Sequence, residues 1–203
     1  MKTGSEKIRL GFLASGRGSN MLAMIDNCEV GKLNAKPVVV ISNNADAGAL
    51  VYAREAGIPA FHLSSNTHED ESVLDQEITN ILKSHEVDWV ILAGYMKKIG
   101  PRLLGEFQGK IFNIHPSLLP RHGGQGMYGL HVHEAVLASG ESETGVTIHM
   151  VDGEYDQGRI LAQEKVSVEV DDDPATLAAR VLKLEHELYS ETLQRVIDGK
   201  ISL

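Results

Sequence analysis

Cysteine is almost absent from this chain: Cys28 is the only one among 203 residues. A lone cysteine cannot form a disulfide within the chain, which fits a protein of a reducing compartment. No apolar run approaches the roughly 20 residues of a membrane span. The first residues, Met1–Lys7, lead straight into an expected strand and lack the apolar core of a signal peptide. The sequence therefore predicts a cytoplasmic protein without a membrane anchor.

Positive charge is also scarce. The 19 Lys and Arg residues are outnumbered by 28 Asp and Glu residues, which gives a formal net charge of −9. Surfaces that coat nucleic acid or anionic membranes carry the opposite excess. We therefore expect small-molecule partners, no nucleic acid and no membrane, with any anionic ligand held by a local cradle. The length suits one domain with a large core, so we predict a single domain over residues 1–203, as a monomer or a homodimer.

Short β-branched runs alternate with amphipathic segments over the first two-thirds of the chain. Strands are expected at Ile8–Ala14, Pro37–Ser42, Ala60–Leu63, Asp88–Ala93 and Ile111–His115, and helices near Met21–Ile25, Asp46–Ala56 and Asp70–His85. This alternation is typical of a parallel sheet with helices on both faces.

The last third has a different pattern. Two strands, Gly145–Val151 and Arg159–Val168, are joined by a loop and are expected to be antiparallel. Asp173 and Pro174 have the residue types of a helix N-cap and first turn. Apolar residues then recur at the spacing of a helix that docks on the sheet, at Leu177, Val181, Leu184 and Leu188. The expected fold is α/β, a mostly parallel sheet with a C-terminal antiparallel strand and docking helix.

A glycine-rich loop, Gly16-Arg17-Gly18-Ser19-Asn20, follows the first strand and opens the first helix. Backbone amides at a helix N-terminus attract anions, so the loop is a candidate cradle for one phosphate. Met21 stands where the third glycine of a dinucleotide fingerprint belongs. A tight turn in which Ser19 simply caps the helix explains the same residues, and the local pattern leaves both interpretations open.

Asn113 and His115 are two apart on one strand and therefore project from the same face. An amide can stabilise an oxyanion, and an imidazole with a pKa of about 6.5 can hold or accept a proton. Asp156, in the loop between the last two strands, could orient the imidazole and favour its protonated form. The three predict an acyl- or formyl-transfer group. The alternative is that Asn113 and His115 only cap backbone groups at a strand end.

Other polar clusters do not have the spacing of a metal site. His131 and His133 are two apart, whereas two metal ligands on one helix face need a spacing of four. No metal is therefore expected. His149 lies within an apolar strand and is predicted to be a hydrogen-bonded structural residue. Glu185 borders the apolar stripe of the last helix, where a carboxylate needs a partner.

The motifs together resemble a known family. Gly16–Asn20, Ser42–Asp46, Leu92–Met96, Asn113–Pro120 and the Asp156 loop occur in this order. This arrangement resembles the phosphoribosylglycinamide formyltransferases, a branch of the formyl-folate transferase superfamily that also contains formyltetrahydrofolate hydrolases. The resemblance runs from about Ile8 to the last helix.

The resemblance implies a Rossmann-like, doubly wound fold and transfer of a formyl group from 10-formyltetrahydrofolate, as co-substrate, to the amine of glycinamide ribonucleotide in purine synthesis. It implies that Asn113, His115 and Asp156 are catalytic. The implied ribonucleotide contacts are Gly18, Ser19, Asn20, Pro116 and Glu185. The implied formyl-folate contacts are Tyr95, Met96, Lys97, Lys98, Ile99, Asn113, Asp152, Gly153, Glu154, Tyr155 and Asp156.

Two departures from the family pattern stand out. The stretch Arg121–Gly129 is longer than the usual link, and the region around Glu71 is acidic where some members place an arginine that meets folate. Lys97 and Lys98 are the expected substitutes for that arginine. The rival functions are hydrolysis of formyl-folate, which in relatives goes with an extra N-terminal regulatory domain, and a binding module without chemistry.

Overall fold

The structure is a computed structural model that describes residues 6–203, so the prediction about the N-terminal residues lies outside it for residues 1–5. The chain forms two compact units, divided between Ile111 and Phe112. The first contains β1 (Ile8–Ala14), α1 (Ser19–Glu29), β2 (Ala35–Ser42), α2 (Gly48–Glu55), β3 (Ala60–His62), α3 (Glu71–Ser84), β4 (Trp89–Leu92) and α4 (Pro101–Glu106). The second contains β5 (Ile111–His115), α5 (Leu130–Ser139), β6 (Glu143–Met150), β7 (Ile160–Ser167) and α6 (Pro174–Ile197). The first residue of β5, Ile111, is the last residue of the first unit. The single domain over residues 1–203 stays a prediction.

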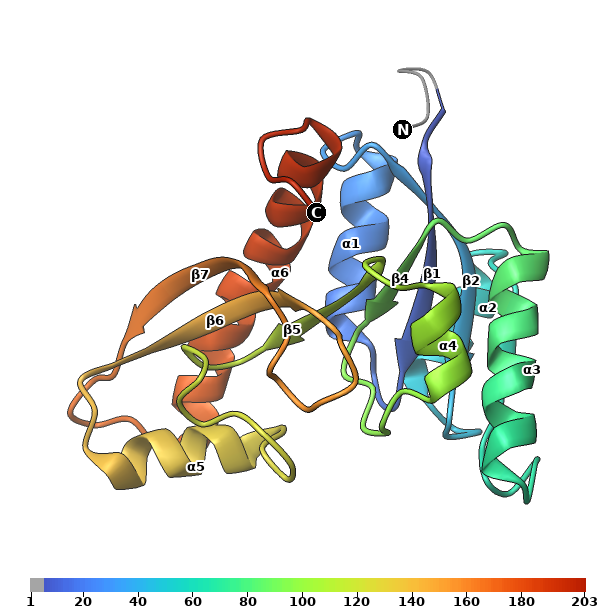
Figure 1. Ribbon diagram of the computed structural model, residues 1–203. Helices are drawn as coiled ribbons and strands as arrows, with labels where there is room; N and C mark the ends of the chain where they lie inside the picture. Colours follow the sequence, from blue (N-terminus) through green and yellow to red (C-terminus); the bar gives the residue numbers. More distant parts are fainter. Residues whose placement is uncertain (1–5) are drawn as a thin grey trace. The chain divides into compact units, whose positions relative to one another are not determined.

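The strands of the first unit follow the order β3-β2-β1-β4, and its strand pairs β1–β2, β1–β4 and β2–β3 are parallel. Figure 1 shows α1 and α3 on opposite sides of β1 and β2. All four residues of β4 are buried, as expected for a strand covered on both faces. Gly11 of β1 lies so close to α3 that an added Cβ would stand 2.6 Å from the Cδ2 atom of Leu82. The strands thus end in loops at one edge of a parallel sheet, where ligands bind in open α/β folds.

The second unit has the strand order β5-β6-β7, with β6 antiparallel to both neighbours. Its long helix α6 contacts β6 and β7. Asp173 caps the helix by accepting from the backbone amides of Ala175 and Thr176, and its own backbone amide donates to the Thr176 hydroxyl, which completes a capping box. The Tyr189 hydroxyl donates to the Phe112 carbonyl over 2.8 Å and ties α6 to β5. The predicted fold class, antiparallel strand and docking helix are confirmed.

Two short helices were not predicted. The six residues of α4 are too few to display an apolar period, and the helix begins after Gly100, a residue without a capping side chain. Helix α5 buries Val132, His133 and Val136, so one of its core positions is a histidine. Because a polar residue interrupts the apolar stripe, the sequence does not display a clear helical period for α5.

Candidate active site

Antiparallel pairing of β5 with β6 brings the polar side chains of the candidate site in the second unit to one face of the sheet. Asn113 lies directly opposite His149, and His115 lies opposite Thr147. Residues opposite one another on an antiparallel pair point to the same face. The Nδ2 atom of Asn113 is 3.0 Å from Nε2 of His149. The register therefore adds His149, which the sequence marked as structural, to the two predicted residues.

The hydrogen bonds of His149 fix how it meets the Asn113 amide. Its Nδ1 atom is 2.9 Å from the carbonyl oxygen of Met150. A carbonyl can only accept, so Nδ1 carries the proton and Nε2 of the neutral ring accepts from the Asn113 NH₂ group. This arrangement orients the Asn113 side chain with its nitrogen toward β6.

Asp156 is shared by both histidines. Its Oδ2 atom lies 3.5 Å from Nδ1 of His115, and its Oδ1 atom lies 3.5 Å from Nε2 of His149. The backbone amide of Gly124 donates to Oδ2 over 2.8 Å. Asp156 itself has a φ of 55°, a strained value for a residue other than glycine. The carboxylate is thus held against both rings by backbone contacts.

The Asp156 loop returns to the sheet through a glycine. An added Cβ at Gly158 would stand 1.8 Å from the carbonyl oxygen of Met150, at the end of β6. Met150 in turn donates its backbone amide to the Arg159 carbonyl over 2.9 Å. Only glycine permits this close approach, which brings the loop back beside the strand that carries His149.

Burial and neighbouring charges shift the pKa values of His115 and Asp156 in opposite directions. Burial lowers the pKa of His115, whereas the Asp156 charge and the hydrogen bond to the His122 carbonyl raise it less strongly. Burial would raise the pKa of Asp156, but the neighbouring His149, the His115 charge and the Gly124 amide outweigh it, so this pKa is lowered. Asp156 therefore favours a charged His115, as the sequence suggested, but burial favours the neutral ring more strongly.

The segment around Gly123–Gly126, which the sequence predicts to be a mobile loop near the site, completes the surroundings of His115. The carbonyl oxygen of His122 is 2.7 Å from Nε2 of His115, so the ring faces acceptors at both nitrogens. His122 belongs to Arg121–Gly129, the stretch longer than the usual family link. Its length was visible in the sequence, but nothing in the residue types indicated a backbone contact.

The turn after β5 is held by Thr147. Its hydroxyl donates to the Ser117 carbonyl over 2.6 Å and accepts from the Leu119 amide over 3.1 Å. Pro116 at the start of the turn is half-buried, and Ser117 is fully buried. Because these hydrogen bonds hold the turn, they also hold the backbone of His115 at the end of β5.

The predicted phosphate cradle lies in the first unit. Gly18 has a φ of +71° and precedes α1, which begins at Ser19. Ser19 makes no side-chain cap, so the interpretation of Ser19 as a plain N-cap is wrong. The backbone amides of a first helical turn have no acceptor within the helix. Such amides at Ser19 and Asn20 suit an anion.

The predicted folate loop of the first unit follows β4. Met96, Lys97 and Lys98 are exposed, and the Met96 amide donates to the Ser15 hydroxyl over 2.8 Å. Burial, with a smaller effect of Asp75, raises the pKa of Tyr95 to about 12, so its hydroxyl stays protonated. Ile99 is only 7% exposed, which leaves its backbone rather than its side chain for a ligand.

The remaining predicted residues lie in the second unit. Asp152, Glu154 and Tyr155 are exposed and Gly153 is half-buried, in the loop that leads to Asp156. Glu185 is 9% exposed and stands inside the buried face of α6, whereas Leu184 is only half-buried. Leu177, Val181 and Leu188 are buried as predicted, whereas the Glu185 carboxylate takes the core position expected for Leu184.

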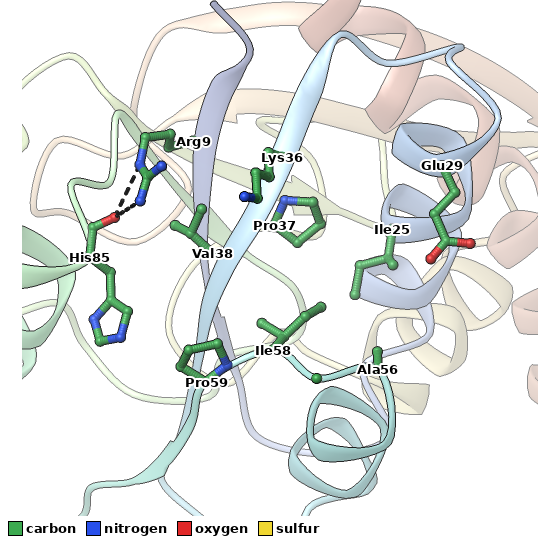
Figure 2. A pocket seen from close by; sticks show the side chains of 11 residues that line it. Arg9, Ile25, Glu29, Lys36, Pro37, Val38, Ala56, Ile58, Pro59 and His85 are labelled. Carbon is green, nitrogen blue, oxygen red and sulfur yellow. Dashed lines mark hydrogen bonds between the residues drawn. The ribbon is translucent and has the colours of Figure 1, made fainter.

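Two open pockets occur in the first unit. One, of about 580 Å³, adjoins the glycine-rich loop and includes Ser15, Arg17, Asn43 and Asp46. The other, of about 470 Å³, lies where β1 and β2 begin (Figure 2). There Arg9 donates to the His85 carbonyl over 2.8 Å, so its guanidinium fastens the end of α3. The second pocket therefore has a structural arginine and none of the predicted site residues.

Within residues 6–203, no three His, Cys, Asp or Glu side chains are arranged to hold a metal ion. In the same range, no helix is long and apolar enough to cross a bilayer.

Comparison with known proteins identifies the family. A family model described as formyl transferase matches residues 8–193. The chain belongs to the formyl transferase family. A phosphoribosylglycinamide formyltransferase of Arabidopsis thaliana, described as chloroplastic, is 43% identical over 95% of this chain and 66% of its own length. The protein of that name from Escherichia coli (strain K12) is 36% identical over 94% of this chain and 88% of its own length.

Solved structures agree over the whole chain. Glycinamide ribonucleotide transformylase 1 from Symbiobacterium toebii has a TM-score of 0.92 and 34% identity, covering 100% of this chain and 93% of that one. A formyltetrahydrofolate deformylase from Pseudomonas syringae has a TM-score of 0.87 at 23% identity, which shows the shared fold alone. The chain spans 66% and 62% of the Arabidopsis thaliana and Vigna unguiculata relatives.

Proposed function

We propose that this formyl transferase family member moves the formyl group of 10-formyltetrahydrofolate to the amine of glycinamide ribonucleotide, a step of purine synthesis. The observation that carries the proposal is the group around Asp156. Its carboxylate lies 3.5 Å from nitrogens of both His115 and His149, and His149 lies 3.0 Å from the Asn113 amide. An oriented amide beside an imidazole–carboxylate pair suits acyl transfer through a tetrahedral intermediate.

The proposed reaction needs no covalent enzyme intermediate. The glycinamide nitrogen attacks the formyl carbon, and the carbonyl oxygen becomes an oxyanion. The Asn113 NH₂ group donates to that oxygen, and the positive charge of His115, protonated as charge develops, stabilises it. The bond from the formyl carbon to the folate nitrogen then breaks, and the proton lost by the amine passes to that nitrogen. Holding two bound reactants in line supplies much of the acceleration.

The binding roles follow the resemblance. Backbone amides at Gly18, Ser19 and Asn20 would bind the ribonucleotide phosphate, because first-turn amides suit anions. Pro116 and Glu185 would meet the rest of the ribonucleotide. The formyl-folate would meet two loops, Tyr95–Ile99 and Asp152–Asp156. Lys97 and Lys98, both exposed, would take the place of the arginine that some relatives direct at folate.

A spectrophotometric assay of the purified protein with 10-formyltetrahydrofolate tests the proposal. Deformylated folate is expected only when glycinamide ribonucleotide is present. Release without the ribonucleotide would identify a hydrolase instead. No release in either reaction would favour a binding module without chemistry.

His115→Ala tests the catalytic assignment. We expect kcat to fall by about 100-fold or more, because both proton handling and oxyanion stabilisation are lost. Ribonucleotide affinity, measured by isothermal titration, should change little. His131→Ala, at an exposed position of α5, is the matched control. Wild-type turnover in His115→Ala would refute the role.

The cytoplasmic location and the choice between monomer and homodimer stay predictions. Cell fractionation tests the first, and sedimentation of the purified chain tests the second.

A further inference from the structure

The segment 121–124 touches both members of the His115–Asp156 pair through its backbone. The His122 carbonyl accepts from Nε2 of His115 at 2.7 Å. The Gly124 amide donates to Oδ2 of Asp156 at 2.8 Å, and the same oxygen faces Nδ1 of His115. The segment therefore fixes the imidazole on one side and its carboxylate on the other.

The residue types and dihedral angles of this segment give its backbone little intrinsic preference for the observed conformation. Gly123 and Gly124 follow His122, and Gly124 has a φ of +101°. His122 has a φ of 52°, which is unfavourable for a residue with a side chain. Glycine loses more conformational freedom on ordering than any other residue. Contacts from outside the segment must hold it in place.

Glu141 supplies those contacts. Its Oε1 atom lies 3.1 Å from Nε2 of His122, and its Oε2 atom lies 2.9 Å from Nη1 of Arg121. Glu141 lies between the Gly140 C-cap of α5 and the start of β6, so it is attached to two regular elements. Its side chain is 23% exposed and that of His122 is 14% exposed, so solvent screens this pair less than a pair at the surface. The Ser117 hydroxyl adds a 2.6 Å bond to the Arg121 carbonyl.

We propose that Glu141 is a positioning residue for the proposed formyl transfer: by holding Arg121 and His122, it keeps the backbone of residues 122–124 against His115 and Asp156. The inference rests on the proposed function for its catalytic consequence. With both ring nitrogens facing acceptors, the imidazole cannot rotate freely, and its cationic form has a partner for each proton. Loss of the anchor would free the ring, and small misplacements of a reacting group cost much rate.

The charged and titratable groups around His115 are Asp156, His149, His122 and His133. The His122 carbonyl raises the pKa of His115, so its withdrawal lowers that pKa further. The alkaline limb of the kcat profile should then move to lower pH. A merely structural role for Glu141 would not move it.

Glu141→Ala is the first test. We expect kcat to fall by about tenfold or more with KM for the ribonucleotide within about twofold, because the loss affects the ring and not binding. Glu141→Gln keeps one of the two contacts and should recover part of kcat. Glu143→Ala is the control, because it removes the same charge two residues away, where the partner is Lys165 at 2.7 Å. Equal kcat and pH profiles in Glu141→Ala and the wild type would overturn the proposal.

A double-mutant cycle with His122→Ala, which keeps the backbone carbonyl, follows the same contact. The double variant Glu141→Ala/His122→Ala should be no slower than the worse single variant by more than about twofold, since both remove one interaction. Multiplying effects would show that Glu141 acts by another route and overturn the proposal.

Nitrogen-15 NMR of the labelled wild type and Glu141→Ala separates the two proposals. The His115 Nε2 signal should lose its hydrogen-bonded shift in the variant, with circular dichroism unchanged. An unchanged signal would overturn the inference even if the enzyme transfers formyl groups. If the wild type shows no transfer, the proposed function fails while this signal still tests the anchor.

Discussion

At the scale of single residues, the orientation of the Asn113 amide depends on His149. His149 accepts from Asn113 through Nε2 because Nδ1 is committed to the Met150 carbonyl. We expect His149→Ala to lower kcat by about 10- to 100-fold, because the oxyanion donor loses its alignment. His149→Gln, which offers an acceptor, should recover part of the loss. Steady-state kinetics on purified variants would measure both, and wild-type kcat in His149→Ala would contradict the role.

The residue-scale prediction from the sequence reached Asn113 and His115 because they share a strand and its period places them on one face. It did not reach His149, since only the register of β6 against β5 brings His149 opposite Asn113. Register depends on long-range pairing that one sequence does not display. The contact of the His122 carbonyl could not be predicted for a further reason. Every residue has a backbone carbonyl, so residue type does not indicate which carbonyl will meet His115.

At the scale of elements, the start of α4 depends on a side chain from α3. Gly100 cannot cap the helix, and the carboxylate of Asp75 accepts from the amides of Arg102 at 2.8 Å and Leu103 at 3.2 Å. Asp75→Ala should destabilise the protein by about 1–3 kcal/mol, because it leaves two amides at the start of α4, one of them on the buried Leu103, without their acceptor. Urea unfolding followed by circular dichroism would measure the loss.

The controls for Asp75 lie on the same helix. Asp75→Asn keeps one acceptor oxygen and should cost less than Asp75→Ala. Glu71→Ala removes an exposed carboxylate from the first turn of α3 and should stay within about 0.5 kcal/mol of the wild type. A loss in Glu71→Ala as large as in Asp75→Ala would show that α3 charge, rather than the cap of α4, sets the stability.

Elements differ in how well the sequence predicts them. The ends of β1 and β5 match the predicted ranges, and Asp173 caps α6 as expected, because buried strands and caps leave local signals. Helix α4 has no such signal: its cap comes from Asp75, 27 residues earlier than Arg102. In α6, Glu185 takes the buried position that the spacing of apolar residues predicts for Leu184. A prediction based on hydrophobicity would not place a glutamate there.

At the scale of the whole molecule, stability should depend on buried histidines. Burial lowers the pKa of His115 and of His133, and the His115 charge lowers that of His133 further. The unfolded chain therefore binds protons near pH 6.5 that the folded chain refuses. As pH falls below about 6.5, the free energy of unfolding should fall by up to about 1.4 kcal/mol per pH unit for each histidine. The loss stops once pH is below the folded pKa.

Asp156 acts in a separate pH window. Its pKa is lowered from 3.8, so its contribution to stability is present above that value and is lost only at lower pH. Urea unfolding at pH 7.5, 6.5 and 5.5 therefore isolates the histidines. His133→Gln should make the pH slope shallower, because one buried imidazole no longer titrates. His131→Gln, at an exposed position of the same helix, should keep the wild-type slope. Stability that stays constant or rises from pH 7.5 to 5.5 would mean that Asp156 and the His122 carbonyl, rather than burial, set the charge of His115.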